Sequence, residues 1–202
     1  ASATNIMPSV AVAFVTRLIA EFGDGAVAAW GAGSRISHFV MIPIYALGSG
    51  LVPFVGQNWG AERYDRVRQA RRLAYRFCFL WGAAMVVLLH LGAESIAVHF
   101  STDEAVISRI VQYLWIVPLG FGMVGVFLMT EETLNAIGRP AVATATTAIH
   151  MFVLYAPLAY LGTKGWQMTG LFTGVAVADI LAGFVGVFFV HRQCHQREAN
   201  CI

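Results

Sequence analysis

The sequence predicts an all-α membrane protein with six transmembrane helices. Hydrophobic residues make up 58% of the 202 residues and charged residues only 12%, whereas soluble domains carry about a quarter charged residues. Several apolar runs reach the length of about 20 residues that a bilayer crossing needs. Each run is expected to be helical, because lipid offers no partner to open backbone groups.

The apolar runs divide the chain into one six-helix unit over residues 1–192 and a short cytoplasmic tail over residues 193–202. The runs lie near Ile6–Phe22, Ala26–Val55, Leu73–Leu91, Val106–Thr130, Ala141–Leu161 and Thr169–His191.

Prolines and glycines mark two of these runs as irregular. The second run contains Pro43 and Pro53, which favour a kink or an extension beyond the bilayer. The fourth contains Pro118 and Gly120, which allow either a hinge or simple close packing.

Polar breaks separate the runs. Ser101 with Glu104 three residues later resembles a capping box, which predicts a helix start. Gly138 is expected to end one helix, and Pro140 suits the first position of the next.

The distribution of arginine predicts which side of the membrane each connection faces. The first and third connections contain no lysine or arginine, and the fifth contains only Lys164. Basic residues instead occupy the second and fourth connections and the tail: Arg63, Arg66, Arg68, Arg71, Arg72, Arg76, Arg139, Arg192 and Arg197. By the positive-inside rule these connections are cytoplasmic, so both ends of the unit face the cytoplasm of a cell inner membrane.

The basic segment Glu62–Arg76 is expected to begin as a helix at the inner surface, with Glu62 and Arg66 spaced for an ion pair. A solvated loop near lipid headgroups and a lipid or partner site both fit it.

The sequence gives little support to other classes of protein. Aromatic and basic residues are not interleaved as on a nucleic-acid surface, and the three cysteines show no metal or disulfide spacing. An H-E-x-x-H motif, a G-x-S-x-G motif and a glycine-rich phosphate loop are all missing, so no enzyme is predicted. The chain starts at Ala1 without a methionine or a signal peptide, which is the expectation for a fragment or a processed half.

Five short segments, in this order and spacing, resemble the multidrug and toxic compound extrusion (MATE) transporters. In chain order they are Ala26–Gly31 with Ser34–Ile36, Gly56–Ala61, Phe100–Val106, Leu134–Pro140 and Pro157–Gly162.

The resemblance implies a twelve-helix transporter of two six-helix lobes, of which this chain is the C-terminal lobe. It also implies export of cationic amphipathic drugs in exchange for H⁺ or Na⁺, by rocking of two lobes around a central cavity. The expected partners are the lipid bilayer, cationic drug-like substrates and the N-terminal lobe, and no cofactor besides the coupling ion is expected.

Charged groups inside a span are functional candidates, because burying them is costly. His150 lies about nine residues into the fifth span and Asp179 about ten into the sixth, so both fall near the bilayer midplane. One hypothesis is a proton-sensitive pair, since histidine changes charge near neutral pH. A static hydrogen bond, or no contact at all, remains open.

Glu131 and Glu132 lie in the inner third of the fourth span, and Asn135 shares a helix face with Glu131. Adjacent helical residues point about 100° apart, so at most one of the two acids is expected to face a cavity fully. The resemblance implies coupling-cation carboxylates on the first and fourth helices, but the only acid of the first span is Glu21, at its outer end.

Arg17 and Arg35 fall in the outer halves of the first two spans and are interpreted as structural. We expect them to face the interior of the lobe, with Glu21 as an ion-pair partner of Arg17.

Two other readings stay open. One is a lipid-linked oligosaccharide flippase of related architecture, and the other is a non-transporting fragment or membrane scaffold.

Overall fold

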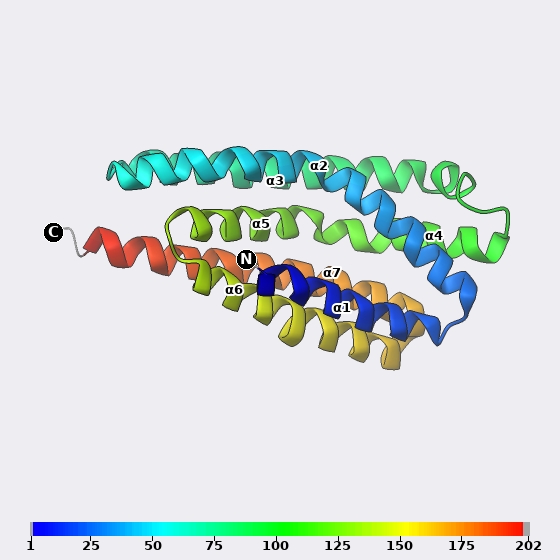
Figure 1. Ribbon diagram of the computed structural model, residues 1–202. Coiled ribbons are helices and arrows are strands. Elements are labelled where there is room, and N and C mark those ends of the chain that lie inside the picture. Colours follow the sequence, from blue (N-terminus) through cyan, green and yellow to red (C-terminus); the bar gives the residue numbers. More distant parts are fainter. Residues whose placement is uncertain (1, 200–202) are drawn as a thin grey trace.

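The computed structural model describes residues 2–199 and consists of helices joined by short turns (Figure 1). The prediction of an all-helical membrane fold is confirmed. In chain order the helices are α1 (Ser2–Ala20), α2 (Asp24–Gly60), α3 (Tyr64–Ala97), α4 (Glu104–Ile116), the 3₁₀ turn η1 (Val117–Gly120), α5 (Phe121–Ala136), α6 (Pro140–Ala148), the π-helix η2 (Ile149–Tyr155) and α7 (Ala156–Ala199).

Four helical stretches of the described chain are long and apolar enough to cross a membrane. They are Asp24–Gly60, Tyr64–Ala97, Glu104–Ala136 and Pro140–Cys194, and Met7–Ala20 is a shorter apolar helix. The last stretch contains non-helical backbone at Trp166 and Gln167. The chain reverses direction at this break: Gly162 before it and Gly170 after it lie against each other. Five of the six predicted runs fall within these helical segments, and the first, Ile6–Phe22, extends two residues beyond the end of α1 at Ala20. The exact membrane boundaries stay predictions.

The helices lie roughly along one long axis, with α5 between α3 and α7 (Figure 1). The glycines of this bundle permit close crossings: a Cβ on Gly82 of α3 would lie 2.6 Å from the Cα of Gly122 of α5. Small residues at such crossings let backbones approach, which is how membrane helices gain packing energy.

Helix α2 stays continuous through Pro43 and Pro53 but changes direction between its blue and cyan parts (Figure 1). A proline cannot donate to the carbonyl four residues before it, so the backbone near Phe39 and Val40 is loosened. The indole N–H of Trp81 on α3 donates to the carbonyl of Val40 at 2.8 Å. The neighbouring helix thus supplies a donor at the bend.

Two predicted helix starts need correction. Helix α4 is capped by Asp103, whose carboxylate accepts from the Ala105 N–H at 2.8 Å, while the hydroxyl of Ser101 accepts from the Asp103 N–H. The predicted capping box at Ser101 is therefore wrong by two residues.

Glu62 has a positive φ of 60° and lies before α3, which begins at Tyr64. It cannot pair with Arg66 through helical spacing. In the same segment Arg68 forms an ion pair with Asp65 at 3.5 Å. The start predicted at Pro140 is confirmed, with Gly138 at a φ of 76° in the preceding turn.

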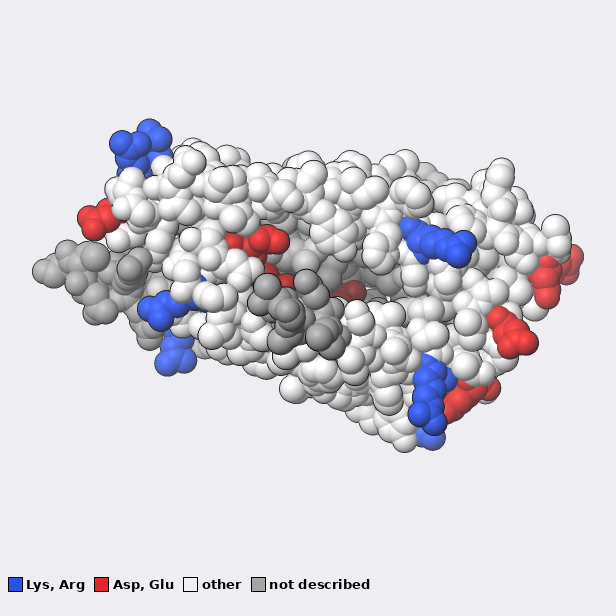
Figure 2. Space-filling model, in the orientation of Figure 1, with Lys and Arg blue, Asp and Glu red and all other residues white. Residues whose placement is uncertain are grey.

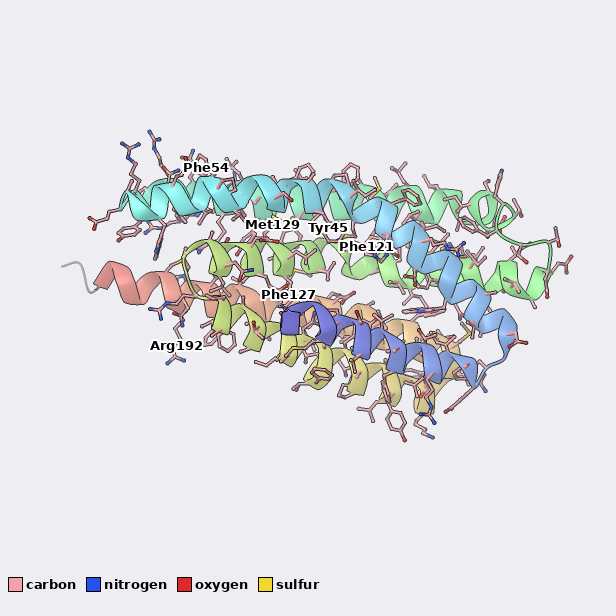
Figure 3. The ribbon with its side chains drawn as sticks, viewed as in Figure 1. Tyr45, Phe54, Phe121, Phe127, Met129 and Arg192 are labelled. Carbon is pink, nitrogen blue, oxygen red and sulfur yellow. The ribbon has the colours of Figure 1, made fainter. Side chains whose placement is uncertain are left out.

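Charged side chains gather toward the two ends of the long axis (Figure 2). The turn after α2, the turn after α5 and the end of α7, where Arg192 lies, share one end of the molecule (Figures 1 and 3). These are the arginine-rich connections, and we call this end the basic end. Helix α7 continues through the predicted tail to Ala199, and residues 200–202 lie outside the described residues.

Candidate functional site

A cavity of about 380 Å³ opens among α1, α2, α4, α5, α6, η2 and α7, with a contribution from the turn η1, whereas its described lining includes no residue of α3. The labelled side chains Tyr45, Phe121 and Phe127, which line it, lie along the space between the α2 side and the α1–α7 side (Figure 3). Its lining comprises Pro8, Val12, Trp30, Ser34, Ser37, His38, Met41, Tyr45, Tyr113, Val117, Phe121, Val124, Phe127, Leu128, Glu131, Thr147, His150, Met151, Tyr155 and Asp179.

Local helix geometry selects this lining. The contributions of α2 from Trp30 to Tyr45, and those of α5 from Phe121 to Glu131, recur at spacings of three or four residues, with one pair of adjacent residues in each helix. Such steps keep side chains on one face of a helix. Each helix thus presents a single stripe to the cavity.

His150 and Asp179 form a buried pair in the cavity wall. The Nε2 atom of His150 lies 3.1 Å from Oδ1 of Asp179, and the side chains are only 3% and 11% exposed. The structure thus brings together two residues that are 29 positions apart and lie on η2 and α7. The other ring nitrogen of His150, Nδ1, is buried without a hydrogen-bond partner among the described residues.

Gly120 allows this pair to form at its present position. A Cβ on Gly120 would lie 2.9 Å from the Cβ of Asp179 and 3.2 Å from the carbonyl oxygen of Ala176. The 3₁₀ turn that contains Pro118 therefore fits tightly against α7 because it ends in glycine. The predicted irregularity of the fourth run serves close packing here.

The π-helix places His150 and Tyr155 on the same wall. Hydrogen bonds of a π-helix span five residues, so residues five apart come to lie over one another. The two rings lie 6.0 Å apart, and the ring of Phe127 meets His150 edge to face at 4.8 Å. Single π-turns inside α-helices occur frequently at functional sites.

Glu131 is the second acid of the cavity. Its carboxylate accepts a hydrogen bond from the hydroxyl of Thr147, which lies one turn before His150. Glu132 and Asn135 are not among the lining residues: Glu132 packs toward Gly48 of α2, and Asn135 is exposed. Of the two adjacent acids, one faces the cavity and the other does not.

The expected orientation of the two outer arginines is wrong. Arg17 and Arg35 are both exposed, and the described residues include no ion pair between Arg17 and Glu21. Each arginine lies in a run that is apolar around the whole helix, so the sequence did not indicate which face of the helix is buried. The exposed position avoids the cost of burying a charge.

An aromatic group that sequence reasoning did not single out completes the outer part of the cavity. Trp30 and Tyr113 meet at 5.6 Å, Tyr113 meets Phe172 at 5.3 Å, and the Tyr113 hydroxyl lies 2.8 Å from the Ser37 hydroxyl. An aromatic residue in an apolar run carries no signal that separates a cavity wall from a core position.

The charge of the cavity indicates which class of ligand it can bind. Glu131 and Asp179 line it together with His150 and His38, and its described lining contains no lysine or arginine. In the space-filling view, acidic atoms are visible in a hollow near the middle of the molecule (Figure 2). Carboxylates and aromatic faces are the groups that attract organic cations. No group of three His, Cys, Asp or Glu side chains suited to a metal ion occurs among the described residues.

The fold and the cavity define a polytopic helical membrane protein that encloses an acidic and aromatic site within one bundle. The family to which the chain belongs is MATE: the family model described as MatE matches residues 1–161.

Known proteins agree with this membership. The chain is 30% identical over 200 residues to a protein of Shewanella oneidensis named FAD transporter, covering 99% of this chain and 44% of that protein. It is 21% identical over 190 residues to the probable multidrug resistance protein YoeA of Bacillus subtilis, covering 94% and 40%. The crystal structure of the Vibrio cholerae MATE transporter VcmN in the bent form matches with a TM-score of 0.93 at 28% identity, covering 96% of this chain and 44% of that one. The chain thus spans less than half the length of these relatives.

Proposed function

We propose that this chain is the C-terminal six-helix lobe of a multidrug exporter that exchanges cationic amphipathic compounds for H⁺ or Na⁺. The observation that carries the proposal is a cavity that holds two carboxylates and several aromatic rings, with no lysine or arginine in its described lining. Relatives named as multidrug resistance proteins support the same reading. Nothing in the proposal requires an enzymatic step.

Exchange follows from competition for the same acidic groups. A proton or sodium ion that binds at Asp179 or Glu131 removes the negative charge that would hold an organic cation. Conversely, an organic cation bound at these carboxylates disfavours binding of the coupling ion there. Such mutual exclusion, combined with a cavity open to one side of the membrane at a time, produces antiport.

The remaining elements of the proposal concern the surroundings of the lobe. A second, N-terminal six-helix lobe would enclose the other side of the transport path, and the lipid bilayer would cover the exposed apolar belt. The basic end is assigned to the cytoplasmic face of the inner membrane by the positive-inside rule.

Binding of a fluorescent cationic dye to the purified chain in detergent tests the proposal. We expect Asp179→Asn to weaken dye binding by at least about tenfold, since a hydrogen-bonded contact to a charged group is worth about 1.5–3 kcal/mol and 1.4 kcal/mol is tenfold. The matched control is Asp65→Asn, which removes an exposed acid outside the cavity and should leave binding unchanged. Equal binding by wild type and Asp179→Asn would contradict the proposal.

A second candidate, export of a flavin dinucleotide, is favoured by the relative named FAD transporter. FAD is anionic through its two phosphates, so it would have to bind through its flat rings against the aromatic wall at Trp30 and Tyr113. Titration of the same protein with FAD separates the two candidates. Saturable FAD binding that survives Asp179→Asn, together with no dye binding, would favour the second.

A further inference from the structure

The two acids of the 380 Å³ cavity, which we call the acidic cavity, lie at different depths in the bundle. Asp179 lies at the level of Gly120, since a Cβ on Gly120 would be 2.9 Å from the Cβ of Asp179. Glu131 follows eleven residues after Gly120 on the same span. We propose, building on the proposed function, that the acidic cavity binds elongated dications. One cationic end lies at Asp179, the other lies at Glu131, and an apolar linker joins them.

The helices that carry the two acids set the distance between the two charges. Eleven residues at about 1.5 Å each place the backbone of Glu131 about 16 Å from that of Gly120. Side chains of a helix lean toward its N-terminus, so the carboxylate of Glu131 lies back toward the level of Asp179. On the other wall, Thr147 contacts Glu131 and His150 contacts Asp179. The carboxylates are thus on the order of 10 Å apart, too far for one ammonium group to contact both.

No basic side chain of the described lining neutralises the two acids. The lining contains no lysine or arginine, and the sequence contains none before Arg17. The buried Nδ1 atom of His150 has no partner among the described residues. This fits a neutral ring beside Asp179, because a protonated ring would bury a second N–H without an acceptor. A cation placed beside each carboxylate favours the charged form of that carboxylate.

The wall between the two acids is apolar. Phe121, Val124, Phe127 and Leu128 of α5 line the cavity, and all four precede Glu131 along the helix (Figure 3). An aliphatic or aromatic linker would bury its surface against these side chains. A second charge held against this wall, away from an acid, would be costly. The distance between the charges of the ligand therefore has to match the distance between the acids.

A second cavity, of about 430 Å³, lies at the basic end and offers no comparable site. Arg68, Arg71 and Arg72 belong to its described lining, which includes no acid. Displacement of a bound cation from the chain is therefore expected to report on the acidic cavity.

Competition with the bound fluorescent cationic dye tests the dication site in the purified chain. The competitors are straight-chain diamines from diaminobutane to diaminodecane, and the matched ligands are monoamines of the same chain lengths. We expect monoamine affinity to rise steadily with chain length through burial of further CH₂ groups. Diamine affinity should instead pass through a maximum at the length that reaches both acids. At this length the diamine should bind at least about tenfold more tightly than the monoamine, through one further charged contact.

Glu131→Gln should abolish the advantage of the diamine and change monoamine affinity much less, since Asp179 still binds one ammonium group. The matched control is Glu132→Gln, which removes the adjacent acid that does not line the cavity and should preserve the advantage. Equal losses in the two variants would overturn the proposal in favour of general attraction to acids. The chain-length series on the wild type tests the site independently of whether Glu131→Gln folds.

The outcomes separate the dication site from the proposed function. Suppose that the dye binds and is lost in Asp179→Asn, while diamines bind no more tightly than monoamines at any length. That result overturns the dication site and leaves the exporter proposal in place. A wild type that binds neither dye nor amines overturns both.

Discussion

His150 occupies the junction between the two acids of the acidic cavity. Its Nε2 atom contacts Asp179, and Thr147, one turn earlier on the same wall, contacts Glu131. The buried Nδ1 atom has no protein partner among the described residues, and a buried polar atom without a partner is costly. A water molecule or a substrate group that hydrogen-bonds to Nδ1 would remove that cost. The residue is thus suited to report the occupancy of the cavity.

We expect His150→Gln to reduce the pH response of dye binding while keeping binding at high pH. Protonation of His150 adds positive charge beside Asp179, so acidification should weaken cation binding in the wild type. Glutamine can still donate to Asp179 but cannot take up a proton. Dye affinity measured at a series of pH values on both sides of neutrality checks this.

The control for this variant is His90→Gln. His90 stacks on Trp115 at 6.1 Å, bonds within its own helix and does not line the acidic cavity. Its replacement should leave the pH response intact. An unchanged response in His150→Gln would show that another group senses the proton.

Counting residues along the spans predicted that His150 and Asp179 lie at a common depth, because a charge stands out in an apolar run. The same counting did not show which of Glu131 and Glu132 faces inward, since that depends on how α5 rotates against its neighbours. Tyr113 and Tyr155 gave no signal, because aromatic residues suit lipid, core and cavity equally.

At the scale of the element, irregular turns shape the acidic cavity together with the regular helices. The π-helix Ile149–Tyr155 brings His150 and Tyr155 to one wall. Hydrophobic periodicity does not reveal such a turn, because the surrounding run is apolar on every face. The bend of α2 was predicted from its prolines, but the donor at the bend, Trp81, belongs to another helix and depends on the tertiary fold.

We expect Trp81→Phe to lower the free energy of unfolding by about 1 kcal/mol, the typical value of one hydrogen bond. Phenylalanine fills similar space but leaves the carbonyl of Val40 without its indole donor. Thermal or denaturant unfolding in detergent measures the change. Trp115→Phe, at a half-exposed tryptophan, is the matched control and should have little effect.

The bend itself supplies a second test of the Trp81 contact. In a Pro43→Ala background the regular helix bond to Phe39 is restored and the backbone around Val40 tightens, so the cost of Trp81→Phe should shrink. Equal costs in both backgrounds would mean that Trp81 acts through packing alone.

At the scale of the whole molecule, the two cavities differ in charge and in depth. The acidic cavity is lined from within the spans by Asp179 and Glu131, whereas the cavity at the basic end is lined by Arg68, Arg71 and Arg72. The arginine count of the connections predicted that one end would be basic. It could not predict that α3 and α7 would enclose a cavity there, because that depends on how distant helices pack.

The orientation of the chain in the membrane is the remaining prediction at this scale. We expect the basic end to face the cytoplasm, since arginine-rich connections are retained on that side. In a variant without Cys78, Cys194 and Cys201, a single cysteine replaces Arg139 at the basic end or Asp103 at the other end. A membrane-impermeant thiol reagent applied to intact spheroplasts should label the cysteine at position 103 and label the one at position 139 only after permeabilisation. Labelling of position 139 in intact spheroplasts, with protection of position 103, would reverse the assigned orientation.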